Sequence, residues 1–280
     1  MPTLTRQFTT PGEIQPDPNE NLTTELWRRE KDTPNEPILL YRQGDEFVPI
    51  TYGEMAARVR RLAAGLMGMG LEPGTRVCLF SPTRYEFTLL DYAIWAAGCA
   101  TVTIYETSSA EQVKWIVTDS GAAVVICGDD DRRKVLESAL ADVDADPVVF
   151  VMDGGGLDEL IARGEHITDE QVMERAQSVT QQDLATLVYT SGTTGMPKGC
   201  ELTVRNFVWT VPQARSILTE VLNPDDITLM FLPLAHSFAR IVQVGSVATG
   251  AKIAYSTGLD KLTEELQIVR PTWLFSVPRV

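Results

Sequence analysis

Apolar residues occur along this chain in short continuous runs, and between the runs they recur every three or four positions. Runs at 77–80, 100–105 and 122–127 predict strands that are buried on both faces. The segments between them have the spacing of helices that turn one apolar face inward. Strand and helix therefore alternate, which is typical of an α/β fold with predominantly parallel sheets covered by helices.

The same pattern gives the expected elements over most of the chain. The predicted strands are 37–41, 47–50, 77–80, 100–105, 122–127, 147–152, 184–189, 228–232, 252–255 and 273–277. The predicted helices are 22–30, 51–66, 85–97, 110–118, 132–140, 204–218, 240–248 and 259–269, with two short ones inside the polar stretch 153–183. Thr51 and Glu54 have the spacing of a capping box, which marks the start of a helix.

This pattern divides the chain into three predicted parts. Residues 1–20 are rich in proline and poor in apolar residues, so we expect an extended arm. Residues 21–183 would form a first α/β subdomain, and 184–280 would begin a second one. The sequence stops at Val280 directly after a predicted strand, so we expect it to be the first part of a longer protein.

Composition and charge narrow the class of partner. Of 280 residues, 44% are hydrophobic and 22% are charged, which excludes disorder over most of the length. The 24 basic and 38 acidic residues give a net charge of −14, which disfavours nucleic acid and anionic membrane surfaces. Residues 1–30 contain no apolar core of the length that a signal peptide needs, and no apolar run in the sequence is long enough to span a membrane, so we expect any membrane contact to be peripheral and apolar.

The four cysteines show no C-x-x-C spacing, and three of them lie in apolar runs. This predicts reduced, mostly buried thiols in a cytoplasmic protein.

The strongest chemical signal is the loop at 189–199, Tyr-Thr-Ser-Gly-Thr-Thr-Gly-Met-Pro-Lys-Gly, between a predicted strand and a predicted helix. Its hydroxyls can donate hydrogen bonds, its glycines let the backbone approach an anion, and its lysine brings a positive charge. It is neither a Walker A loop nor G-x-G-x-x-G. A random loop of this composition would be a surface loop, but the ordered run favours a phosphate site. The candidate ligands are Thr190, Ser191, Gly192, Thr193, Thr194, Gly195 and Lys198.

This run resembles the phosphate-binding signature of the adenylate-forming superfamily, which includes acyl-CoA synthetases, peptide-synthetase adenylation domains and firefly-type luciferases. The resemblance implies that the loop holds the pyrophosphate part of ATP. It also implies that the hydroxyl of Thr193 helps to hold Mg²⁺ and that Lys198 reaches the phosphates.

A second motif is the run 231–240, Phe-Leu-Pro-Leu-Ala-His-Ser-Phe-Ala-Arg. The chain has only two histidines, and His166 lies in a polar stretch where we expect it to be a solvated surface residue. His236 follows a predicted strand, where open α/β sheets bind ligands, although an isolated loop histidine is more often structural. The run is similar to the family's Leu-Pro-x-x-His element. That similarity gives His236 a catalytic and substrate-binding role, and places Phe238 in the carboxylate-substrate pocket.

Tyr105-Glu106-Thr107 and the closing run 276–280 look like the long-chain acyl-CoA synthetase branch. The implied reaction uses ATP, Mg²⁺ and coenzyme A to convert a fatty acid into acyl-AMP and then acyl-CoA. We find no Tyr-Gly-x-Thr-Glu run, no Thr-Gly-Asp run and no hinge with a catalytic lysine in 1–280. We therefore expect this chain alone to be unable to complete adenylation. The alternatives are a non-catalytic nucleotide-binding module, or adenylation of an aryl or amino acid.

Three further features have structural explanations. Asp129-Asp130-Asp131 could hold a metal, but acids followed by basic residues are typical of a helix start. Trp95 and Trp115 are expected in the core rather than in a stacking platform. Arg58, Arg60 and Arg61 are expected on a solvated helix face.

Overall fold

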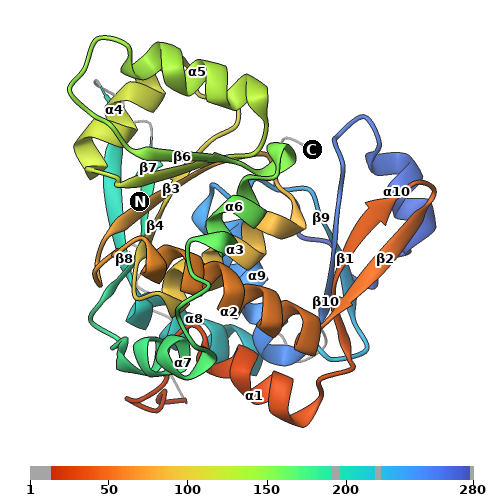
Figure 1. Ribbon diagram of the computed structural model, residues 1–280. Coiled ribbons are helices and arrows are strands. Elements are labelled where there is room, and N and C mark those ends of the chain that lie inside the picture. The colour runs from red at the N-terminus through yellow and green to blue at the C-terminus, as the bar shows by residue number, and fades with distance from the viewer. Residues whose placement is uncertain (1–13, 191–195, 218–221, 278–280) are drawn as a thin grey trace, which may run out of the picture.

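The computed structural model describes residues 14–190, 196–217 and 222–277, and Figure 1 shows how its elements are arranged. Helices and strands alternate as the apolar pattern predicts, and most strands are parallel. In chain order the elements are α1 (Thr24–Asp32), β1 (Pro37–Gln43), β2 (Glu46–Thr51), α2 (Tyr52–Gly68), β3 (Arg76–Phe80), α3 (Tyr85–Ala96), β4 (Ala100–Ile104), α4 (Ala110–Ser120), β5 (Val124–Cys127), α5 (Asp130–Leu140), β6 (Val148–Val151), the 3₁₀ helix η1 (Met152–Gly154), α6 (Gly156–Ala162), α7 (Asp169–Ser178), β7 (Leu184–Thr190), β8 (Lys198–Thr203), α8 (Val204–Ile217), β9 (Ile227–Met230), α9 (Ser237–Thr249), β10 (Lys252–Tyr255) and α10 (Leu262–Val269).

The larger of two sheets has six strands in the order β6-β5-β3-β4-β7-β8. All neighbours are parallel except β7 and β8, which are antiparallel. Successive residues of a strand point to opposite faces, so each face of this sheet has its own core. Val77 and Leu79 pack toward α2 and α3, whereas Cys78 and Phe80 pack toward α4 and α5. This explains why the inner strands are continuous apolar runs.

The smaller sheet has the order β2-β1-β10-β9, and it joins the start of the chain to its end. β1 pairs in parallel with β10, so Leu39 lies opposite Ile253. Helices α2, α3 and α9 lie between the two sheets, and α3 contacts both β4 and β1. Both sheets contain strands from either side of residue 184, since β7 and β8 join the six-stranded sheet and β1 and β2 join the other. The subdomain boundaries stay a prediction.

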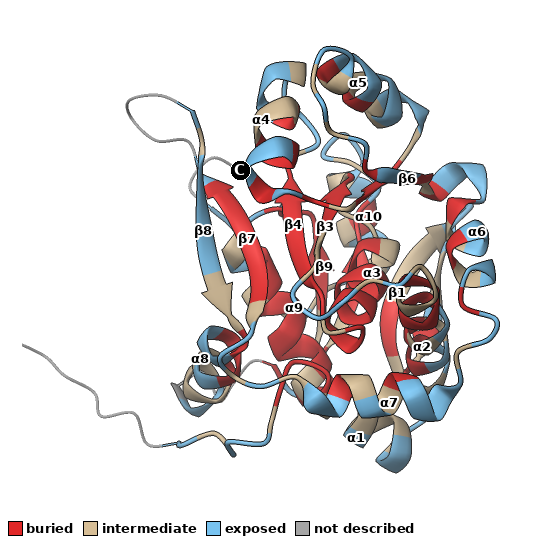
Figure 2. Ribbon diagram, turned by 60° about the vertical axis from the view of Figure 1, so that its left-hand side comes forward, coloured by how far each residue is buried: buried red, intermediate tan, exposed pale blue. Residues whose placement is uncertain are grey.

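Two strand predictions differ from the structure. The run 273–277 forms no strand, although Thr272 exchanges two hydrogen bonds with Ile227: its amide donates to the Ile227 carbonyl at 2.9 Å and its hydroxyl accepts from the Ile227 amide at 3.0 Å. Trp273 and Phe275 stack edge to face instead, with ring centroids 4.7 Å apart. Conversely, β8 was not predicted, because this exposed edge strand has no apolar run. Figure 2 shows the contrast between buried β7 and exposed β8.

Several local predictions are confirmed. Thr51 caps α2 in a complete capping box with Glu54. Asp129 caps α5, and its side chain accepts a hydrogen bond from the Arg132 amide, as a helix start requires. Arg60 departs from expectation: its side chain is only 15% exposed and forms ion pairs with Glu30 and Asp169.

The cysteines are free, as predicted. Cys200 is exposed, whereas Cys78, Cys99 and Cys127 are buried. Burial raises the pKa of each of these three thiols to about 12.

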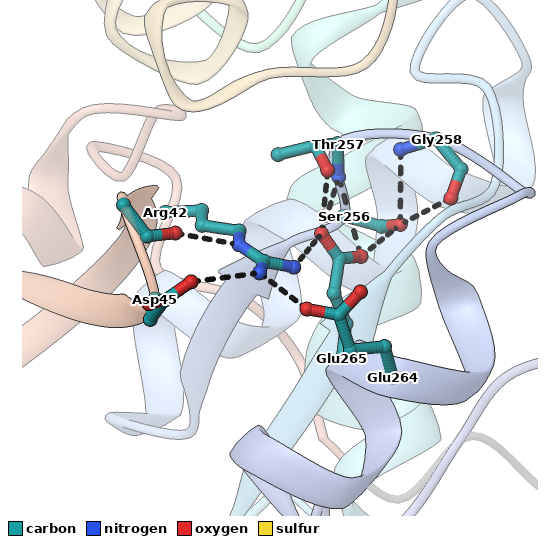
Figure 3. Close-up of polar contacts among 8 residues, drawn as sticks. Arg42, Asp45, Ser256, Thr257, Gly258, Glu264 and Glu265 are labelled. Carbon is teal, nitrogen blue, oxygen red and sulfur yellow. Dashed lines mark hydrogen bonds and ion pairs between the residues drawn. The ribbon is translucent and has the colours of Figure 1, made fainter.

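A buried carboxylate fixes the segment between β10 and α10 (Figure 3). Glu265 is fully buried and accepts hydrogen bonds from the hydroxyls of Ser256 at 2.5 Å and Thr257 at 2.6 Å. Arg42 of β1 lies 3.6 Å from Glu265 and 2.5 Å from Glu264. The contacts join α10 to the β1–β2 hairpin, although the two are far apart in sequence.

Within residues 14–190, 196–217 and 222–277, no helix combines the length and apolarity needed to cross a membrane.

Candidate functional site

The predicted phosphate loop connects the ends of two antiparallel strands. Thr190 is the last residue of β7 and Lys198 is the first residue of β8, and the two lie opposite each other in the ladder. Both side chains are exposed. In the described part of the chain, Lys198 Nζ has no hydrogen-bond or ion-pair partner, so its charge is free to meet an anion. The stem of the loop thus presents a hydroxyl and a positive charge side by side, and its phosphate-binding role stays a prediction.

The centre of the loop, Ser191, Gly192, Thr193, Thr194 and Gly195, lies outside the described residues. Their phosphate-binding roles, and the Mg²⁺ role of Thr193, therefore stay predictions. In the described residues, no group of three or more His, Cys, Asp or Glu side chains is arranged to hold a metal ion. The run Asp129–Asp131 is therefore not such a group.

His236 is the N-cap of α9, which begins three residues earlier than predicted. Its Nδ1 accepts a hydrogen bond from the Phe238 amide at 3.2 Å, so in neutral imidazole the proton resides on Nε2. The side chain is exposed. With Nδ1 engaged by the backbone, Nε2 is the nitrogen of this exposed ring that can donate to another group.

Two threonine hydroxyls position the loop before His236: Thr83 lies in the loop after β3, and Thr103 lies in β4. Thr83 Oγ1 donates to the Leu232 carbonyl and accepts from the Leu234 amide, both at 2.9 Å. Thr103 Oγ1 donates to the Ala235 carbonyl at 2.9 Å. The loop follows β9 of one sheet, yet its backbone is held by a strand of the other sheet and by the loop after another strand of that sheet.

These contacts bring the histidine loop and the phosphate loop to one edge of the sheet. Thr103 lies opposite Val188 in the β4–β7 pairing, and Val188 is two residues before Thr190. Neighbouring strands are about 4.8 Å apart and each residue advances about 3.3 Å. The residue next to His236 is therefore tied to the strand beside the one that ends at Thr190. The two motifs meet at the carboxyl ends of parallel strands, where open α/β sheets bind ligands.

A fully buried ion pair anchors the first turns of α9. Arg240 Nη2 donates to Asp91 Oδ1 at 2.6 Å and Nε donates to Oδ2 at 3.1 Å, and both side chains are completely buried. The carboxylate also accepts from Thr101 at 2.8 Å and from Gln243 at 3.0 Å. All four contacts are donated to Asp91, as an ionised carboxylate requires.

Burial raises the pKa of Asp91, against the lowering effect of Arg240. Burial likewise lowers the pKa of Arg240, against the raising effect of Asp91. The network extends through Gln243 to Thr88, and from Thr88 to the Tyr255 hydroxyl at 2.5 Å. It thereby joins α3, α9 and both sheets behind the histidine.

Phe238 projects from the first turn of α9 and is 37% exposed. Its ring packs edge to face on Phe275, with centroids 5.4 Å apart. Phe238 therefore presents an apolar surface beside His236, as a pocket for a carboxylic acid with an apolar tail would need.

A cavity of about 400 Å³ lies between α1, α8 and α9. Its walls are largely apolar and include Phe207, Val211 and Val244, and the N-terminal segment covers one side with Leu22. Val244 lies eight residues after His236 in sequence, which is roughly 12 Å along a helix. The volume is within the range of about 300–1,000 Å³ that is typical of ligand pockets.

The sequence reasoning missed the residues that support the site. Thr83 and Thr103 gave no signal, because a threonine near a strand end is commonplace. Arg240 lay inside the quoted motif without a role. The signal that could have found it is a charged residue, followed three positions later by Gln243, on the helix face that also carries apolar residues.

Comparisons with known proteins show which family and which fold the chain resembles. The family model described as AMP-binding enzyme matches residues 26–280. The chain is 35% identical to long-chain-fatty-acid–CoA ligase FadD15 of Mycobacterium bovis, over 98% of this chain and 46% of that protein. It is 31% identical to the peroxisomal long chain acyl-CoA synthetase 7 of Arabidopsis thaliana, over 84% of this chain and 35% of that protein.

Among solved structures, the inhibitor-bound N-terminal domain of FACL13 from Mycobacterium tuberculosis matches with a TM-score of 0.79 and 25% identity. The match covers 93% of this chain and 63% of that one. The chain spans about half or less of the length of the curated relatives it matches.

Proposed function

Because the chain belongs to the AMP-binding enzyme family, we propose that it serves in the ATP-dependent activation of a long-chain fatty acid. The fatty acid would first become acyl-AMP and then acyl-CoA. Its family membership confirms the resemblance that the loop and the Leu-Pro-x-x-His element carry in the sequence. The observation that supports the proposal is the hydrogen bond from Thr103 to the Ala235 carbonyl, which ties the loop before His236 to the strand beside β7, the strand that ends at Thr190.

The first step brings a carboxylate up to the negatively charged phosphates of ATP, and the charge repulsion between them raises the barrier. The residues of the site would lower this barrier. A fatty-acid carboxylate oxygen attacks the α-phosphorus of ATP, the bond from that phosphorus to the bridging oxygen breaks, and pyrophosphate leaves. Lys198 would pair with the phosphates, and the hydroxyl of Thr190 would donate to them. Mg²⁺, where bound, would neutralise phosphate charge with help from Thr193. No covalent bond to the protein is needed.

His236 would orient the carboxylate by donating a hydrogen bond from Nε2. In the second step the thiol of coenzyme A attacks the acyl carbon, AMP leaves, and a thioester forms. We propose that the hydrocarbon tail passes Phe238 and occupies the cavity lined by Phe207, Val211 and Val244. The apolar walls and the run of α9 from His236 to Val244 support this assignment.

The whole reaction is proposed for a protein longer than residues 1–280. Relatives that are named as ligases are about twice as long or longer, and the runs for the adenine site, the ribose and the catalytic lysine are absent from this sequence. We therefore propose that the isolated chain binds nucleotide and fatty acid without completing turnover. The free cysteines favour a reducing compartment, and we propose the cytoplasm.

Binding of a non-hydrolysable ATP analogue tests the proposal on the chain itself. Lys198→Met should weaken binding about tenfold or more in titration calorimetry, because a charge-assisted hydrogen bond contributes about 1.5–3 kcal/mol. Lys31→Met, an exposed lysine on α1, is the matched control and should bind as the wild type does. Equal affinity of Lys198→Met and wild type would contradict the proposal.

A second experiment separates a ligase from a nucleotide-binding module. Pyrophosphate exchange into ATP, measured on a longer protein that contains this chain, should depend on added fatty acid. ATP binding without fatty-acid-dependent exchange would favour the non-catalytic module, and exchange driven by aryl or amino acids would favour the other alternative.

A further inference from the structure

Helix α4 contacts β7 and the residue just before β8, on the two sides of the phosphate loop, through two side chains one turn apart. Trp115 and Asp119 are four residues apart and therefore lie on the same face of the helix. Trp115 Nε1 donates to the Pro197 carbonyl at 2.7 Å. Asp119 Oδ2 accepts from the Tyr189 hydroxyl at 2.6 Å. Neither contact is needed to form the helix or the ladder.

The contacted residues flank the loop on both sides. Tyr189 is the residue before Thr190, and Pro197 is the residue before Lys198. In the ladder, Tyr189 lies opposite Gly199, and a side-chain carbon at Gly199 would come 3.1 Å from the Tyr189 ring. The ring therefore covers the glycine, an arrangement known to support glycines in sheets. Lys198 is thus held between two fixed neighbours.

The helix is itself well fixed, so it can act as a support. Ser109 and Gln112 form a capping box at its start, and Gly121 ends it in the left-handed conformation. Val113, Ile116 and other apolar residues of α4 pack into the core on the outer face of the six-stranded sheet. The indole of Trp115 packs against the same core and is only partly buried, so it is not a simple core residue.

An edge strand needs such support if its first residue is to hold a ligand. β8 has a neighbour on one side only, and its first four residues are exposed. A long, strongly hydrated lysine on such a strand loses much rotamer and backbone freedom when it binds phosphate. Contacts that restrict the strand before binding reduce that loss.

We propose that Trp115 and Asp119 are positioning residues for the nucleotide phosphates, acting through Pro197 and Tyr189 on Lys198 and Thr190. The inference rests on the proposed function, because it assigns the two contacts of Trp115 and Asp119 to the binding of the same nucleotide. It predicts that loss of either contact weakens phosphate binding while the fatty-acid cavity, which lies between other helices, is unaffected.

The test compares four variants of the chain by two measurements. Trp115→Phe removes the indole donor and part of the ring but keeps an aromatic side chain, and Asp119→Ala removes the acceptor. Asp119→Asn keeps an acceptor and is the conservative rescue. Thr118→Ala is the matched control, since this exposed threonine of α4 bonds only to its own helix.

The first measurement is the affinity for the ATP analogue, with a fluorescent fatty acid as the second ligand. Trp115→Phe should weaken analogue binding about three- to tenfold, the range for one neutral hydrogen bond, and Asp119→Ala should weaken it at least as much, because the lost bond is made to a carboxylate. Fatty-acid affinity and the thermal midpoint should change little, and Asp119→Asn and Thr118→Ala should match the wild type.

The second measurement is amide hydrogen exchange over residues 198–203, without ligand. Exchange should be faster in Trp115→Phe and unchanged in Thr118→Ala. Unchanged analogue affinity in Trp115→Phe would overturn the proposal, and so would an equal loss of fatty-acid affinity, which would indicate general destabilisation. If the wild type itself fails to bind the analogue, the proposed function fails. In that case, faster exchange in Trp115→Phe would show that the Trp115 contact only stabilises β8, which also overturns the positioning role of Trp115.

Discussion

Replacing Arg240 with methionine should destabilise the folded chain more than an ordinary core substitution. Methionine fills a similar volume without the charge, so the main change is that Asp91 stays buried with no cation. Breaking a buried ion pair by removing one partner costs about 3–5 kcal/mol. Thr101 and Gln243 still donate to the carboxylate, which places the expected value toward the lower end.

A double-mutant cycle with Asp91→Leu separates the energy of the ion pair from the effect of changed packing on the free energy of unfolding. Removal of Asp91 alone leaves a buried guanidinium over the Trp95 ring. Removal of both charges leaves two unpaired donors, on Thr101 and Gln243, at about 1–3 kcal/mol each. The double variant should therefore cost less than the sum of the two single variants, with a coupling energy of about 2 kcal/mol.

Urea denaturation followed by circular dichroism measures these differences from the midpoint at constant slope. Because domains are stable by only about 5–15 kcal/mol, Arg240→Lys provides a milder variant that keeps the charge but loses the two-pronged geometry. Additivity of the two single substitutions within about 0.5 kcal/mol would refute the reasoning, since independent sites behave in that way.

Three further predictions concern the cavity, the cysteines and a helix cap. Val244→Phe should fill part of the cavity and lower the affinity for the longest fatty acids more than for short ones; a displacement assay across chain lengths checks this, and a uniform loss would contradict it. At pH 8 a thiol reagent should modify Cys200 alone in the native chain. The three buried thiols contribute full stability below their ordinary pKa of 9.0, and that contribution is lost as the pH rises toward 12, so native stability should fall across that interval and a flat profile would be inconsistent. Thr51→Ala should cost about 1 kcal/mol in urea denaturation, because it removes the capping box of α2, and no change would show that the cap is dispensable.

The helices and inner strands could be predicted because their signals are local. A strand that is buried on both faces must be apolar at every position, and a helix cap needs a particular residue three positions before its partner. The capping box of α2 and the buried run of β3 were therefore readable from the sequence, as was the resemblance of the phosphate loop. His236 was also singled out from its motif, since the order of residues around it is distinctive, and its role stays a prediction.

One strand was missed and one was wrongly predicted, because a strand forms only where a neighbouring strand is available to pair with it. β8 carries polar, exposed residues and is a strand only because β7 offers its free edge. The run 273–277 has the composition of a strand, yet after Thr272 it finds no neighbouring strand within the described residues, and its aromatic rings pack on Phe238 instead. A ladder is a property of two segments, so neither segment alone determines it.

The sequence by itself determined the α/β class, the family and the two motifs, because each is written in consecutive residues. Only the tertiary structure decided that β1 joins β10, that Thr103 holds the loop before His236, and that Arg240 is paired with Asp91. Each of these contacts joins residues more than a hundred positions apart. Their side chains have no local preference for one another, and burial between two packed sheets selects the pairing, since an unpaired charge or carbonyl there would cost more than the ordering of its partner.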